Sequence, residues 1–77
     1  MALIRKFEPK TLSRPYLHRE IAADYATFER DGRVVLQIDT YGSEDRATPG
    51  KQSQTIQLDA AGAAALFEIL KREFNLT

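Results

Sequence analysis

Apolar and polar residues alternate most clearly in the middle of the chain, over residues 33–41. Val34, Leu36 and Ile38 would share one side of an extended strand, because successive side chains point to opposite faces. The other side would be mixed and would carry Val35, Gln37, Asp39 and Tyr41. One apolar side and one mixed side are typical of a sheet that is covered on one face only. The pattern predicts a strand over residues 33–41.

Two weaker patterns flank this strand. Residues 18–28 alternate well enough to predict a strand of their own. Asp31–Gly32 predicts a tight hairpin turn between the two strands, because glycine adopts positive φ without a Cβ clash. Residues 42–51 have glycine near both ends and no apolar anchor, which predicts a loop. The alternation then resumes and predicts a third strand over residues 52–58.

A C-terminal helix is predicted over residues 60–74. Asp59 stands directly before an alanine-rich segment, where an N-cap belongs, and Asn75 suits the helix end. An apolar stripe recurs at spacings of three and four residues and comprises Ala63, Leu66, Phe67, Leu70 and Phe74. The predicted fold class is therefore α+β: an antiparallel sheet of three strands, or of four if one lies in the N-terminal segment, packed against one helix.

The length of 77 residues predicts a single domain. Residues 1–17 contain Pro9 and Pro15 with little periodicity, which predicts a basic arm that is extended or loosely ordered. Residues 18–77 then form one β-β-β-α domain. A chain this short buries only about 60% of its unfolded surface, which favours a homodimer.

Composition excludes several classes of site. The chain has no cysteine, so disulfides and thiolate metal sites are impossible, and the single histidine, His18, cannot supply a multi-histidine metal site. No apolar run approaches the roughly 20 residues that a membrane span requires. We expect a soluble cytoplasmic protein with no cofactor and no membrane partner.

Charge is balanced over the chain but unevenly distributed. The formal net charge is zero, with +4 over residues 1–19 and −4 over residues 20–77. A neutral total argues against a generic polyanion binder. The basic arm could contact nucleic acid, remain a solvated tail, or clamp the acidic body of a partner subunit.

Few residue patterns in the sequence point to catalysis, and we expect no enzyme activity. His18 has no carboxylate at a telling spacing, and Gly42, Gly50 and Lys51 do not form a phosphate-binding loop because no helix begins at the lysine. Acidic residues of the loop could hold a hard cation only in principle, since the calcium-binding loop spacing is absent.

The polar side of the predicted sheet is the more informative feature. It carries Gln37, Thr55, Gln57 and Tyr41, with Arg46 and Lys51 in the adjoining loop. Amides can hydrogen-bond bases, an aromatic ring can stack on them, and cations can contact phosphates. The alternative is that these polar side chains only solvate an exposed sheet face.

The order of motifs adds a resemblance. Residues 32–41, Gly-Arg-Val-Val-Leu-Gln-Ile-Asp-Thr-Tyr, are followed by a polar loop, by Pro49-Gly50-Lys51, by a strand ending at Leu58 and by the helix. This order, which covers most of the chain, resembles the transcriptional positive-cofactor-four family of single-stranded DNA binders. The resemblance implies a curved antiparallel sheet, dimerisation through the helices, and single strands lying along the sheet. It matches Tyr41 to the aromatic strand end of that family and Lys51 to its basic residue after Pro-Gly.

These patterns predict a coactivator-like homodimer that binds single-stranded nucleic acid weakly and largely without sequence preference. The predicted contacts are Arg33, Tyr41, Arg46 and Lys51, assisted by Arg5, Lys6, Lys10 and Arg14 of the arm. The alternative prediction is an adaptor that keeps the fold and binds a protein partner instead of nucleic acid. The zero net charge and the acidic Asp39 on the polar side favour that alternative.

Overall fold

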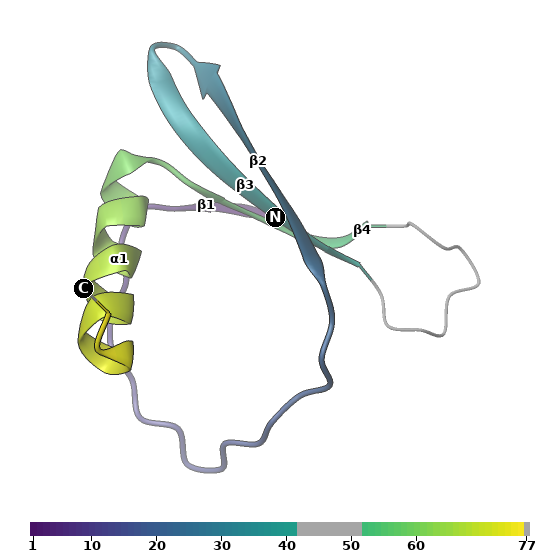
Figure 1. The fold of residues 1–77 in the computed structure, drawn as a ribbon, viewed down its shortest axis with the longest axis vertical. Coiled ribbons are helices and arrows are strands. Elements are labelled where there is room, and N and C mark those ends of the chain that lie inside the picture. The colour runs from purple at the N-terminus through teal and green to yellow at the C-terminus, as the bar shows by residue number, and fades with distance from the viewer. Residues whose placement is uncertain (42–51, 77) are drawn as a thin grey trace.

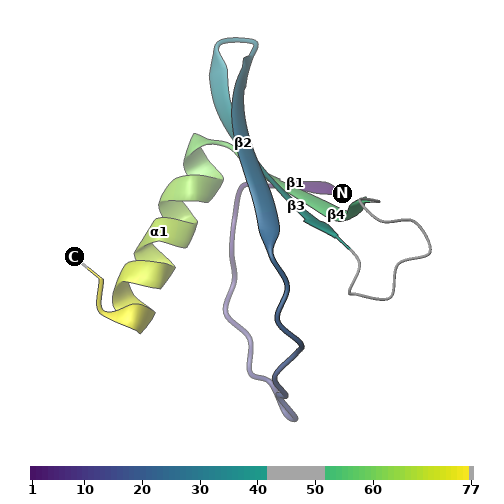
Figure 2. The same cartoon turned by 45° about the vertical axis from the view of Figure 1, so that its right-hand side comes forward.

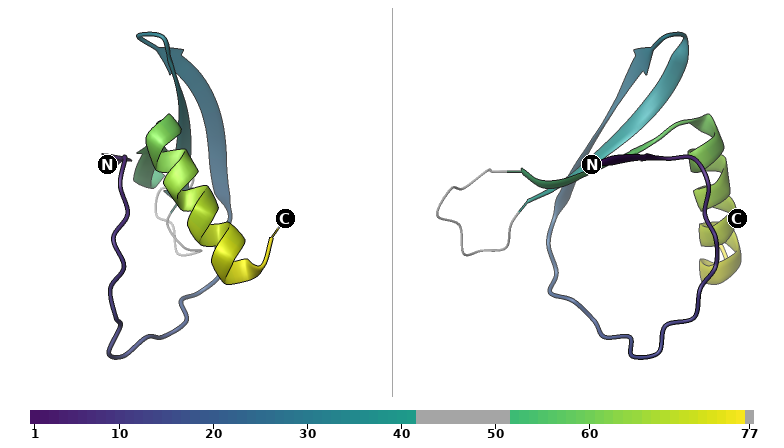
Figure 3. Two further views of the ribbon diagram at one scale, coloured as in Figure 1. Left: turned by 90° about the vertical axis from the view of Figure 1, so that its left-hand side faces the viewer. Right: turned by 180° about the vertical axis from the view of Figure 1, so that it is seen from behind.

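The computed structural model describes residues 1–41 and 52–76 and has an α+β architecture, as predicted (Figure 1). Its elements are β1 (Ala2–Ile4), β2 (Ala23–Arg30), β3 (Arg33–Tyr41), β4 (Gln52–Leu58) and α1 (Ala60–Phe74). The strands form one sheet in the order β1-β4-β3-β2, and α1 lies on one side of that sheet (Figure 3). The sheet is open rather than closed into a barrel.

The β2–β3 hairpin turns at the predicted dipeptide. Asp31 and Gly32 both have positive φ, 56° and 75°, the conformation that two-residue hairpin loops require. Arg30 and Arg33 then close the turn as a cross-strand pair. The prediction of a strand over residues 18–28 was wrong at both ends, because β2 starts where it meets the end of β3 and continues to the turn.

A fourth strand lies in the N-terminal segment. β1 pairs with β4 in parallel, with Ala2 opposite Ile56 and Ile4 opposite Leu58. The sheet is therefore mixed, with antiparallel pairing between β2, β3 and β4 and one parallel edge. Covering the outer edge of β4 removes an exposed row of backbone donors and acceptors. The prediction of a wholly antiparallel sheet missed this edge.

Both ends of α1 agree with the prediction. Asp59 has extended backbone and its side chain accepts a hydrogen bond from the Gly62 amide, as an N-cap does. Asn75 ends the helix in the left-handed conformation, with φ 59° and ψ 40°, and its amide donates to the Lys71 carbonyl. The helix packs mainly against β3 and β4. Strand alternation places Leu36 and Leu58 on that side of the sheet.

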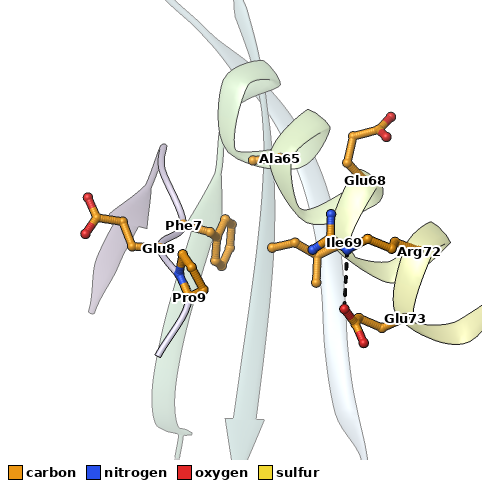
Figure 4. Close-up of a pocket in the computed structure, with 8 residues that line it drawn as sticks. All are labelled: Phe7, Glu8, Pro9, Ala65, Glu68, Ile69, Arg72 and Glu73. Atoms are coloured by element: carbon orange, nitrogen blue, oxygen red, sulfur yellow. Dashed lines mark hydrogen bonds and ion pairs between the residues drawn. The ribbon is translucent and has the colours of Figure 1, made fainter. Parts of the chain in front are cut away.

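The buried side of α1 differs from the predicted stripe. Gly62 is buried, and the half-buried residues are Ala65, Leu66, Ile69 and Leu70. Phe67 and Phe74 are 53% and 68% exposed, although the stripe placed both against the sheet. The N-terminal segment accounts for the rotation: the Ile4 carbonyl lies directly over Gly62, and Phe7 lies across from Ile69 (Figure 4).

The single chain has a small core. Among the described hydrophobic residues only Val35 and Leu58 are buried. The accessible surface is 6950 Å², whereas a compact monomer of this mass exposes about 4,700 Å². The radius of gyration is 14.8 Å, against about 11.5 Å for a compact chain of this length. The β2–β3 hairpin extends beyond the first turn of α1, which contributes to this open shape (Figure 2).

Across the described part of the chain, the structure contains no helix that is both long and apolar enough to cross a membrane.

Candidate nucleic-acid interface

The side of the sheet opposite α1, here called the outer face, carries the predicted polar side chains. Residues that pair across antiparallel strands point to the same side. Gln37 pairs with Gln57, and Asp39 pairs with Thr55 on one flank and with Asp24 on the other. The register therefore brings polar residues of β2, β3 and β4 onto one surface, as the strand alternation predicted for β3 and β4.

Four of these residues form a hydrogen-bonded row. The Gln57 Nε2 amide donates to Gln37 Oε1 at 2.9 Å, and Gln37 Nε2 donates to both carboxylate oxygens of Asp39 at 3.1 and 3.2 Å. Thr55 Oγ1 donates to Asp39 Oδ1 at 2.9 Å. We call Gln37, Asp39, Thr55 and Gln57 the polar row. Because each member is held by a neighbour, the amide groups are presented in fixed orientations.

Tyr41 adjoins the polar row at the last position of β3. Its hydroxyl donates to Asp24 Oδ2 at 2.9 Å, and the residue is half-buried. This hydrogen bond raises the pKa of Tyr41 above its ordinary value of 10.0, and partial burial and the nearby carboxylates of Asp24 and Asp39 act in the same direction. The ring is thus a neutral aromatic platform with its hydroxyl anchored.

Two predicted cations meet at the opposite end of β3. Arg5 Nε lies 2.7 Å from Asp59 Oδ2, and a terminal nitrogen of Arg33 lies 4.0 Å from the same oxygen. The Asp59 side chain is only 5% exposed, while those of Arg5 and Arg33 are 62% and 56% exposed. Both guanidinium groups are therefore positioned by a buried carboxylate and still face water.

Asp59 is the second group at this site whose pKa is shifted from its ordinary value. The hydrogen bond from the Gly62 amide lowers the pKa of its carboxyl below the ordinary value of 3.8, and Arg5 and Arg33 lower it further, although burial opposes them. The carboxylate stays ionised and binds both the helix start and the two arginines. It is a structural anchor for the cations on this surface.

The predicted contacts form a track along β3. Arg33 and Tyr41 are the first and last residues of the strand, about 26 Å apart. Alternation places Arg33 on the outer face. The register shifts between Thr40 and Tyr41, and the hydrogen bond to Asp24 places Tyr41 on the same face. The polar row lies between Arg33 and Tyr41. No enclosed pocket is needed for a ligand that is itself extended, and single-stranded nucleic acid is such a ligand.

The remaining predicted contacts lie away from this track or outside the residues that the structure describes. Lys6 Nζ pairs with Glu8 Oε2 at 3.1 Å, and Lys10 and Arg14 are exposed in the segment that leads away from α1. Arg46 and Lys51 lie outside the described residues. The structure thus brings together Arg5 and Arg33, places Tyr41 at the far end of the same surface, and keeps the rest of the arm apart.

Sequence reasoning missed two carboxylates of this site. Asp24 was not singled out, because its pairing with Tyr41 depends on the hairpin register. Asp59 was identified only as the N-cap, because its contact with Arg5 depends on the parallel pairing of β1 with β4. The alternation of β2 could have suggested the first contact, whereas no local signal could have suggested the second.

Other candidate chemistry gains no support from the geometry. His18 is exposed, and its ring lies 4.5 Å from that of Tyr16. Within residues 1–41 and 52–76, no three metal-ligating side chains gather into a group that could hold an ion. A hollow of about 440 Å³ lies between residues 7–9 and α1, on the helix side of the sheet and away from the polar row (Figure 4).

Comparison with protein-family models, with curated proteins and with solved structures found no match to this chain. The resemblance to the positive-cofactor-four family stays a prediction that rests on the residues quoted for it.

Proposed function

We propose that this protein binds single-stranded nucleic acid along the outer face of its sheet, largely without sequence preference, and acts in the cytoplasm as a coactivator-like homodimer. The observation that carries the proposal is the alignment of three kinds of group on one side of β3. Tyr41 supplies an aromatic ring, the polar row supplies oriented amides, and Arg33 with Arg5 supplies positive charge.

Each group suits a different part of a single strand. Stacking of one base on an aromatic side chain contributes about 1–3 kcal/mol and tolerates any base. The amides of Gln37 and Gln57 can donate to and accept from base edges. The two arginines can contact phosphates, which makes the affinity depend on salt. A duplex hides its base faces, so the same surface favours single strands.

A homodimer fits the open shape of the chain. The accessible surface exceeds that of a compact monomer by about 2,200 Å², whereas a standard interface removes about 800 Å² from each partner. Phe67 and Phe74 are the exposed apolar residues of α1 that a helix–helix interface would cover.

The second candidate function is a protein-binding adaptor. The observation that favours it is the presence of two carboxylates, Asp24 and Asp39, beside Tyr41 on the outer face. Carboxylates repel phosphates, and they attract basic segments of proteins. The adaptor would bind a discrete protein partner and would have no salt-dependent affinity for oligonucleotides.

Fluorescence anisotropy separates the two candidates. Labelled single-stranded and duplex oligonucleotides are titrated with protein at about 0.05 M and 0.2 M salt. The proposal expects preference for single strands, loss of affinity at the higher salt, and a drop of about 5- to 150-fold for Tyr41→Ala. Tyr41→Phe is the matched control, since it keeps the ring and loses only the hydroxyl.

A double variant tests the loop residues that sequence analysis assigned. Arg46→Glu with Lys51→Glu should abolish binding, because four units of charge change in the segment that follows Tyr41 in the sequence. No binding by the native protein at the lower salt would favour the adaptor. Binding that Tyr41→Ala leaves unchanged would move the site away from the outer face.

A further inference from the structure

The helix side of the β2–β3 hairpin is an uncovered apolar face. Tyr25 and Val34 lie on this side and are 77% and 61% exposed. A hollow of about 250 Å³, here called the hairpin hollow, opens at the first turn of α1 and is lined by Val34, Leu36, Leu58, Asp59, Ala60 and Ala63. Apolar surface of this kind is costly to leave in water.

A second uncovered apolar surface lies in residues 10–22, here called the arm segment; it overlaps only the last part of the basic arm, residues 1–17. Four large side chains project from it: Leu12 is 59% exposed, Tyr16 75%, Leu17 98% and Ile21 51%. Single exposed apolar residues are common on proteins, but four within thirteen residues of irregular chain need a surface to pack on.

The arm segment is held away from the hollow of its own chain. The pairing of β1 with β4 and the Arg5–Asp59 ion pair fix the chain before it, and β2 fixes the chain after it. In Figure 1 it runs along the bottom of the molecule, whereas the hairpin and the first turn of α1 are at the top. The hairpin hollow is therefore left open to a second molecule.

We infer that two copies of this chain exchange arm segments, so that residues 10–22 of each copy lie over the hairpin hollow of the other. The inference rests on the proposed dimer and names its contact surface. Charge supports a second copy as the occupant: Lys10 and Arg14 belong to the arm segment, and the exposed Glu29 is the cross-strand partner of Val34 beside the hollow. The excess accessible surface of about 2,200 Å² leaves room for such an interface in addition to helix pairing.

Cysteine crosslinking tests the contact directly, because the native chain has no cysteine. The variant Leu17→Cys with Val34→Cys is treated with a short bismaleimide at micromolar concentration and analysed on a denaturing gel. Exchange of arm segments predicts a covalent dimer. The matched control is Leu17→Cys with Gln57→Cys, because Gln57 lies on the outer face and should not be reached.

A second variant measures the energetic contribution of the arm segment. Leu17 is 98% exposed in the single chain, so Leu17→Asp leaves the fold of a monomer intact. Sedimentation equilibrium should give a dimer dissociation constant at least tenfold higher for Leu17→Asp than for the native chain. The dimer is weakened because a buried leucine is lost from each half of the interface. Leu17→Met should keep the native dissociation constant.

The outcomes separate this inference from the proposed dimer. A native dimer with crosslinking through position 34 and a weakened Leu17→Asp variant supports arm exchange. A native dimer that crosslinks through neither pair, or equally through both, overturns arm exchange and leaves helix pairing. A chain that sediments as a monomer at micromolar concentration overturns both.

Discussion

Arg5 Nε lies 2.7 Å from Asp59 Oδ2, and this ion pair joins the residue after β1 to the residue before α1. The same carboxylate caps the helix through Gly62 and faces Arg33 at the hairpin. One side chain thus connects the N-terminal segment, the hairpin and the helix. The positions of two proposed phosphate contacts depend on it.

Asp59 should make stability depend on acid pH. Its pKa in the folded protein lies below the ordinary 3.8, so its contribution to the free energy of unfolding is complete above about pH 4 and is lost as pH falls through the folded-state pKa. Asp59→Ala should lower the melting temperature at neutral pH by about 4–8 °C. Asp59→Asn keeps a cap and should cost less. If the difference between native protein and Asp59→Asn does not shrink in acid, the ion pairs do not contribute as described.

Gly62 should resist substitution for a steric reason. Glycine to alanine within a helix normally stabilises a protein by about 1 kcal/mol. Here the Ile4 carbonyl occupies the place of the new Cβ, so Gly62→Ala should destabilise by about 1–3 kcal/mol. Urea unfolding measures the change, and Ala61→Gly, an exposed neighbour, should cost about 1 kcal/mol. A stabilised Gly62→Ala variant would mean that β1 does not lie over the helix start.

Tyr41 should ionise at higher pH than an unperturbed tyrosine. The hydrogen bond to Asp24 favours the neutral phenol, and its contribution to stability is present below pH 10 and is lost as pH rises through the folded-state pKa. Absorbance of tyrosinate during a pH titration measures this, and Tyr41→Phe identifies which of the three tyrosines is responsible. Asp24→Ala removes the acceptor and should return the titration toward the ordinary value. An unchanged curve in Asp24→Ala would contradict the hydrogen bond.

Local patterns predicted the elements that have local causes. The hairpin follows from Asp31-Gly32, the helix ends follow from Asp59 and Asn75, and the outward side of β3 follows from period-two alternation. The parallel edge at β1 could not be predicted, since three residues carry little periodicity and their partner is distant in the sequence. The same missing contact explains the error in the helix stripe, because Ile4 and Phe7 decide which side of α1 is covered.

The candidate site likewise contains some residues that local patterns predicted and others whose positions depend on tertiary contacts. Tyr41, Gln37 and Gln57 were assigned to the outer face from alternation alone. The register places the two glutamines there, and the hydrogen bond to Asp24 places Tyr41 there. The pairing of Arg5 with Asp59 depends on tertiary contacts and has no signal in the sequence near either residue. The separation of Arg33 from Tyr41 follows from the length of β3, which the sequence pattern predicted correctly.

Asp24 should limit the affinity for single strands if the outer face binds them. Its carboxylate lies beside Tyr41, where a stacked base would bring a phosphate near. Asp24→Asn removes the charge and keeps an oxygen that can accept from the Tyr41 hydroxyl, so the affinity for a single-stranded oligonucleotide should rise about two- to fivefold at low salt. The gain should shrink at higher salt because the repulsion is screened. Glu68→Gln, which removes the same charge from an exposed position on α1, is the matched control and should leave the affinity unchanged. Equal gains in both variants would indicate an effect of net charge alone, and no gain in Asp24→Asn would place the nucleic acid elsewhere on the molecule.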